Sequence, residues 1–171
     1  IQYNVTNILN PDDTFEKAFS TKRRNLVIIN SGRSPELTKI ITKLDTLKAH
    51  NPEMELTMFG YNEWLMYAKY NKDNFEKYNV HLPSNYYYNE NGRQVKALED
   101  KYYRSFHENM QYALPRFAIT GYDHAMYFLG HTTRWLQTPL DFDKVPGGGY
   151  RNNAYYLIHY KPTGGVEAVK Y

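Results

Sequence analysis

The stretch from residue 26 to residue 60 limits most strongly the folds that this chain can adopt. It opens with Leu26-Val27-Ile28-Ile29-Asn30, a short apolar run typical of a parallel strand buried on both faces. A helix is expected from Pro35 until Asn51-Pro52, and a second strand over 53–59. The helical stripe consists of Leu37, Ile40, Ile41, Leu44 and Leu47. A strand, a crossover helix and another strand predict a right-handed β-α-β unit and an α/β fold.

The rest of the chain is less regular. Helices are expected over 11–19, 95–111 and 117–129, the last of them buried, with a short helix after Gly60. Strands are expected over 80–82, 140–145, 153–160 and 166–169. Gly147-Gly148-Gly149 lacks the Lys and Ser/Thr of a phosphate loop, so we interpret it as a hairpin between strands.

Composition excludes several classes of protein. The chain has 171 residues, of which 42% are hydrophobic, so it can form a domain with a core and is not disordered. Its net charge of +3 comes from interspersed acids and bases, which argues against a nucleic-acid partner. No apolar run approaches the roughly 20 residues of a membrane-spanning helix. The 18 tyrosines suit large half-exposed surfaces.

The sequence contains no recognisable catalytic or metal-binding constellation. There is no Cys, which excludes thiol nucleophiles and thiolate zinc sites. The six His residues form no H-x-x-x-H pair, and no G-x-S-x-G elbow is present. No nucleophile, base and orienting group can be assembled from what remains. We therefore predict that the chain is not an enzyme and holds no metal or cofactor.

Two loops that follow the predicted strands carry the candidate ligand-binding residues. Ligands of open α/β sheets gather at the carboxyl ends of the strands. Residues 31–34 combine hydroxyls and a guanidinium with a helix N-terminus, which suits an anion; plain helix capping by Ser34 is the alternative. Residues 60–64 place a carboxylate between aromatics, which suits an ammonium group or a sugar; core packing is the alternative. The candidates are Ser31, Arg33, Ser34, Asn62, Glu63 and Trp64.

Several segments together resemble the second half of the type I periplasmic-binding-protein family, the Leu/Ile/Val-receptor-like group. Phe15-Glu16-Lys17-Ala18-Phe19 followed by Asn25-Leu26-Val27-Ile28-Ile29 looks like the start of a receptor β-α-β unit. The run 95–106 is similar to a helix with an F-x-x-x-Y-x-x-x-F pattern, here at Leu98, Tyr102 and Phe106. Residues 115–125 look like the family's G-Y-D-A helix, with His124 inserted before the Ala. The closing strands around Gly164-Gly165 also fit.

The resemblance implies a three-layer α/β/α fold with a mostly parallel sheet. Residues 1–112 would belong to the second lobe, and residues 113–171 would form a crossover helix and closing strands. The N-terminal lobe is missing from this sequence, so we expect weak ligand binding and either self-association or assembly with the missing part. The ligand would be an amino acid, a peptide or a muropeptide, with Glu63 meeting its ammonium group.

The resemblance also implies a location in the periplasm or cell envelope, in a branch sometimes associated with LysM modules. The alternative function is a structural or interaction domain of the envelope, associated with peptidoglycan, that has lost its small ligand. Within the G-Y-D helix we expect structural roles. Gly121 would permit close backbone approach, Tyr122 would pack inward, and Asp123 would lie near a helix start.

Overall fold

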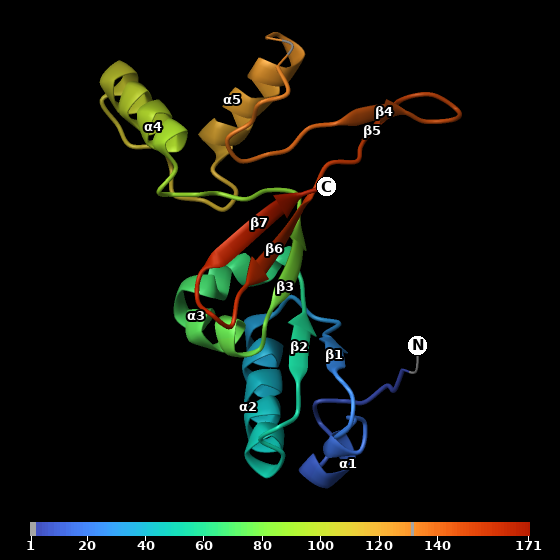
Figure 1. Cartoon of the computed structure of the whole chain (residues 1–171). Helices are drawn as coiled ribbons and strands as arrows, with labels where there is room; N and C mark the ends of the chain where they lie inside the picture. The colour runs from blue at the N-terminus through green and yellow to red at the C-terminus, as the bar shows by residue number, and fades with distance from the viewer. Residues whose placement is uncertain (1–2, 131) are drawn as a thin grey trace. The chain divides into compact units, whose positions relative to one another are not determined.

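A computed structural model describes residues 3–130 and 132–171 (Figure 1). Its main sheet has five strands in the order β1-β2-β3-β6-β7. The strands are β1 (Asn25–Ile28), β2 (Leu56–Phe59), β3 (His81–Ser84), β6 (Tyr156–Tyr160) and β7 (Val166–Lys170). Strands β1 and β2 pair in parallel, as the β-α-β pattern of the sequence predicts, and β2 also pairs in parallel with β3. The α/β class is thereby confirmed.

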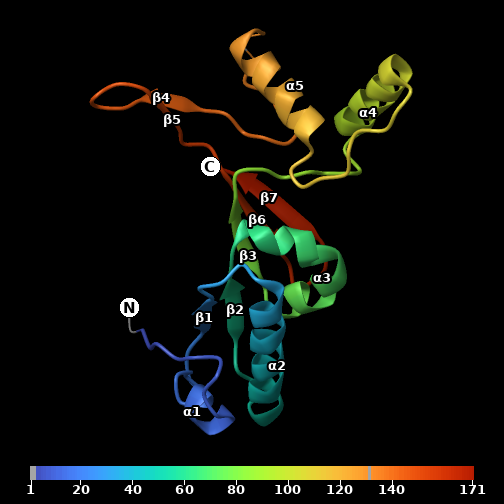
Figure 2. The same ribbon diagram turned by 180° about the vertical axis from the view of Figure 1, so that it is seen from behind.

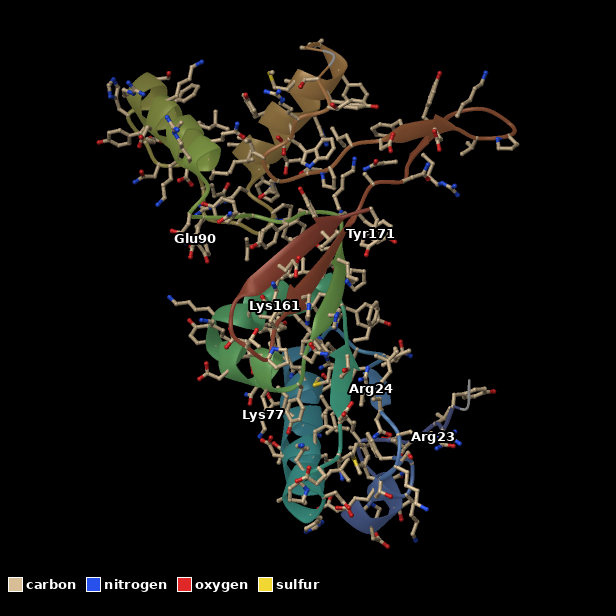
Figure 3. All side chains as sticks on the ribbon, in the orientation of Figure 1. Arg23, Arg24, Lys77, Glu90, Lys161 and Tyr171 are labelled. Atoms are coloured by element: carbon tan, nitrogen blue, oxygen red, sulfur yellow. The ribbon has the colours of Figure 1, made fainter. Side chains whose placement is uncertain are left out.

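Helix α2 (Ser34–His50) connects β1 to β2 and buries the predicted stripe of five aliphatic residues. No side chain caps its N-terminus, where Arg33 occupies the N-cap position, so the capping role expected for Ser34 is wrong. The next connection is the 3₁₀ helix η1 (Asn62–Tyr67) followed by α3 (Ala68–Lys77), a longer helical segment than the sequence indicated. Lys77, labelled in Figure 3, lies at the end of α3. Its ammonium lies 2.6 Å from the Asp45 carboxylate on α2, so an ion pair joins the two helices.

Helices α2 and α3 cover the same face of the sheet, as the two opposite views agree (Figures 1 and 2). Alternate residues of β1 point away from that face. Leu26 is 60% exposed and Ile28 is 70% exposed. The prediction that this strand is buried on both faces is therefore wrong, because only one face of β1 is covered in the part of the chain that the structure describes.

The remaining elements are α1 (Asp12–Glu16), α4 (Arg93–Phe106), α5 (Phe117–Phe128) and the antiparallel pair β4 (Phe142–Lys144) and β5 (Tyr150–Asn152). The turn between β4 and β5 holds Gly147, Gly148 and Gly149 at φ values of 90°, 103° and 85°, a conformation that favours glycine. The hairpin interpretation of this segment is confirmed. Helix α5 is not buried as predicted, since only Ile119 and Asp123 are buried on it.

The chain divides into two compact units. Unit 1 comprises residues 1–82 and 159–167, and unit 2 comprises residues 83–158 and 168–171. The sequence placed a division after residue 112, whereas the compact units divide within β3 and within the two closing strands. Unit 1 contains the β-α-β segment and most of the sheet. Unit 2 contains α4, α5 and the β4-β5 hairpin.

Asp123 organises the polar interior of unit 2. It lies in the middle of α5, not near its start, and is 1% exposed. Its carboxylate accepts backbone N–H bonds from Leu136 (2.7 Å), Gln137 (2.9 Å) and Thr138 (2.7 Å). Burial raises the pKa of this carboxyl, and the three backbone donors oppose that rise. The structural role expected for Asp123 has its physical basis in these contacts.

The two neighbouring expectations fail. Tyr122 is 37% exposed and does not pack inward. A Cβ atom added to Gly121 would have nothing within 4 Å, so no close backbone approach requires this glycine. Helix α5 faces solvent at these two positions.

In the part of the chain that the structure describes, none of the helices combines the length and the apolar character that a membrane span requires.

Candidate functional site

The first loop (residues 30–34) and the second loop (residues 60–64) follow β1 and β2 at adjacent positions of the sheet. Because β1 and β2 are paired in parallel register, their carboxyl ends meet at one edge. This edge is where ligands of open α/β sheets bind. All residues of both loops lie in unit 1.

Contacts between the two loops hold them side by side. The Trp64 indole Nε1 donates to the Ser31 carbonyl at 3.1 Å. The Tyr61 hydroxyl donates to Asn30 Oδ1 at 2.9 Å. A Cβ atom added to Gly32 would lie 3.1 Å from Cβ of Glu63, so the first loop passes directly over the Glu63 side chain. The structure thus brings together the two segments that the sequence selected separately.

Trp64 is the buried residue that supports these two loops. Its ring is 0% exposed and stacks on Phe75, with centroids 5.9 Å apart. A Cβ atom on Gly60 would come within 2.4 Å of the Trp64 ring, so only glycine leaves room for it. A fully buried ring offers no surface to a ligand. The core-packing alternative therefore describes Trp64, and its role at this edge is to position its neighbours.

The first loop is less suited to an anion than its sequence suggests. The Arg33 guanidinium is exposed and already pairs with Glu36 at 3.3 Å. Glu36 is in the first turn of α2, where its carboxylate compensates the positive end of the helix dipole. Oε2 of Glu36 is buried and has no hydrogen-bond partner. The Ser31 hydroxyl accepts the Arg33 backbone N–H at 3.2 Å.

The polar groups at this edge have a net negative character. Glu36 and Glu63 contribute two carboxylates, and Arg33 contributes one guanidinium. Glu63 is exposed, whereas Asn62, Ser31 and Ser34 are half-buried. A carboxylate beside hydroxyl and amide groups is chemically suited to an ammonium group or to a polyhydroxyl ligand.

Two residues at this edge escaped the sequence prediction. Asn30 ends the first apolar run, and Tyr61 stands in the second loop, but neither was selected as a site residue. Their side chains bond to each other across the edge. The sequence feature that could have indicated Asn30 and Tyr61 is their position immediately after the predicted strands.

Among the described residues, no group of three or more His, Asp or Glu side chains is arranged to hold a metal ion.

Comparisons with known proteins found no matching family model, no matching curated protein and no matching solved structure.

Proposed function

We propose that this chain is a ligand-binding segment of an extracytoplasmic receptor of the type I periplasmic-binding-protein kind, and not an enzyme. The proposed ligand carries an ammonium group, as amino acids, peptides and muropeptides do. The proposed location is the periplasm or cell envelope. The three-layer fold of that family, with a further lobe or layer beyond this chain, forms part of the same proposal.

Trp64 joins the first and second loops by its hydrogen bond to the Ser31 carbonyl, and the exposed Glu63 side chain lies against Gly32 at the carboxyl edge of a parallel sheet. This arrangement is the observation that supports the proposal. An ammonium group at Glu63 would form a charge-assisted hydrogen bond. The Ser31 region and the Tyr61-Asn30 pair would supply neutral polar contacts on either side.

The test is a binding screen with amino acids, short peptides and muropeptides, read by thermal shift and then by calorimetry. We expect weak but saturable binding of ligands with a free amino group. Glu63→Gln should weaken binding about tenfold or more, because a charged hydrogen bond is worth roughly 1.5–3 kcal/mol. The matched control is Glu53→Gln, an exposed glutamate of the same unit outside both loops. Equal affinities of these two variants would refute the site.

A second candidate function is supported by the tyrosines. Several of them are largely exposed and therefore available for contact with carbohydrate or another envelope component. Among the described residues, those more than half exposed are Tyr3, Tyr70, Tyr103, Tyr112, Tyr150 and Tyr171. On this alternative the chain is a structural or interaction domain associated with peptidoglycan, and it has no small ligand.

Sedimentation with purified peptidoglycan sacculi separates the two functions. The interaction domain predicts cosedimentation that free amino acids do not reduce, and that replacing exposed tyrosines by Ser abolishes. The receptor predicts small-molecule binding that Glu63→Gln weakens. Cosedimentation with sacculi, together with no detectable binding in the ligand screen, would favour the interaction domain.

A further inference from the structure

Unit 2 contains a groove that is separate from the loops of unit 1. Its volume is about 870 Å³, within the usual size of small-molecule sites. It lies along the second half of α4 and the connection that follows it. It is lined by Glu99, Asp100, Tyr103, Arg104, Asn109, Met110 and Arg116. All of these lining residues belong to unit 2.

Arg116 is held rigidly in the wall of the groove. Its guanidinium lies over the Tyr88 ring at 5.1 Å and over the Tyr112 ring at 4.7 Å. Its backbone N–H donates to Gln137 Oε1 at 2.9 Å, and its carbonyl accepts from Gln137 Nε2 at 3.1 Å. A guanidinium stacked on two rings is pre-organised, so little conformational entropy is lost when it binds a planar anion.

The charge of Arg116 has no carboxylate partner. None of the ion pairs formed by the described residues includes Arg116. A guanidinium has five N–H donors. Nη1 donates to the Gln111 carbonyl at 3.2 Å, whereas Nε is buried without a partner. Arg116 also hydrogen-bonds to the side chain of Tyr88, whose hydroxyl donates to Glu99. A half-buried guanidinium that lines a groove and forms no direct ion pair among the described residues favours a carboxylate from outside the chain.

The opposite charge is present on α4. Asp100 is exposed and lines the same groove, and no ion pair among the described residues includes it. Arg104 donates from Nε to the Asp100 carbonyl at 3.2 Å, which holds its guanidinium along the helix. Glu99 is less available, because its Oε1 accepts the Tyr88 hydroxyl at 2.8 Å. The half-exposed ring of Tyr103 adds apolar surface to the groove, and the buried Met110 also lines it.

We propose that this groove binds a short peptide, with the peptide's C-terminal carboxylate at Arg116 and its amino group at Asp100. The groove is larger than one amino acid requires, and its lining carries both acidic groups, Glu99 and Asp100, and basic groups, Arg104 and Arg116, which suits a zwitterionic ligand. This site is independent of the loops around Glu63, so either proposal can fail without the other.

The probe is tri-L-alanine, titrated into the ¹⁵N-labelled chain while the Arg116 Nε–H and Asn109 side-chain signals are followed by NMR. We expect saturable shifts at both groups. C-terminally amidated tri-alanine should bind about tenfold more weakly or worse, because it lacks the carboxylate. N-acetylated tri-alanine should bind several-fold more weakly. Equal binding of the amidated peptide, or no shift at millimolar peptide, would overturn the proposal.

Variants locate the site. Arg116→Gln should abolish the shift of the Asn109 side-chain signal, and Asp100→Asn should weaken binding of tri-alanine without affecting the N-acetylated peptide. Lys101→Gln, on the same helix but outside the groove lining, is the matched control and should bind normally. If Arg116→Gln does not fold, Asp100→Asn and the two capped peptides still decide the question. Shifts confined to Gly32 and Glu63, and lost in Glu63→Gln, would support the loop site and overturn this one.

Discussion

Unit 1 and unit 2 are held together by different kinds of interaction. In unit 1 large apolar side chains pack to full burial, and Leu44, Met58, Trp64, Phe75 and Val80 are all 0% exposed. In unit 2 one apolar cluster is built on only three buried residues, Val95, Met110 and Ile119. Much of its order comes from polar contacts over long stretches of chain, chiefly those of Asp123 and Gln137.

This difference has a consequence for how each unit responds to mutation. Hydrophobic packing is non-directional, so unit 1 should tolerate conservative apolar exchange. A buried carboxylate that satisfies three backbone donors is directional, and losing it leaves those donors buried without partners. Unit 2 should therefore be sensitive to single polar atoms.

The largest effect is expected for Trp64→Ala. Removing this buried ring should destabilise the protein by about 4 kcal/mol, the usual cost for a large core aromatic. Hydrogen exchange should accelerate first in β2, η1 and α3. Tyr70→Ala is the control, because Tyr70 is an aromatic of the same region and is 84% exposed. Equal exchange rates in the two variants would contradict the assignment of Trp64 to the core.

Asp123→Asn should come next, with a loss of about 3 kcal/mol. The amide keeps one acceptor oxygen, but its NH₂ group would face backbone donors that now have no acceptor. Faster exchange at the amides of Leu136, Gln137 and Thr138 should accompany the loss in melting temperature. Asp141→Asn is the exposed control. An unchanged melting temperature together with lost ligand binding would assign Asp123 to a binding role.

The open face of β1 provides a third test. Leu26 and Ile28 present apolar side chains to solvent from a strand, a feature typical of association sites. We expect the isolated chain to self-associate at micromolar concentration in sedimentation velocity. Leu26→Lys with Ile28→Lys should weaken association about tenfold, whereas Leu9→Lys, at another exposed position of unit 1, should not. A compact monomer at all concentrations would contradict this expectation.

The smallest effect concerns pH. The His81 and His159 rings stack with their centroids 4.1 Å apart. Asn79 accepts a hydrogen bond from each ring, from His81 Nδ1 at its backbone carbonyl and from His159 Nε2 at its side-chain Oδ1. Burial and the neighbouring His81 lower the pKa of His159 from its ordinary 6.5; Lys161 adds to this and Glu167 opposes it. The folded state therefore takes up the proton less readily than the unfolded state.

It follows that the stability contributed by neutral His159 is present above about pH 6.5 and is lost as pH falls through its lower folded-state pKa. Replacing His159 by Gln should flatten the decline in melting temperature between about pH 7 and pH 5, by about a degree or two. His124→Gln, an exposed histidine in unit 2, is the control. A decline that is the same in both variants would assign it to other groups.

Local patterns in the sequence were sufficient for the β-α-β unit and the glycine hairpin. The stripe from Leu37 to Leu47 and the parallel partners of β1 follow from periodicity within a few turns of chain. The three glycines at positive φ are a requirement of one turn and need no distant partner. The class of fold and the edge at which the two loops meet were predictable for this reason.

The tertiary structure alone decided which of these residues are accessible. Trp64 and Glu63 are neighbours in the chain, yet one is fully buried against Phe75 and the other is exposed. Ile28 has the composition of a core strand residue, yet it faces solvent, because the burial of a strand depends on which elements cover each face of the sheet. Likewise Arg116 and Asp123 are contacted by residues about 15 to 30 positions away in the chain. Periodicity is a local property, whereas burial and polar partnership depend on contacts between distant parts of the chain.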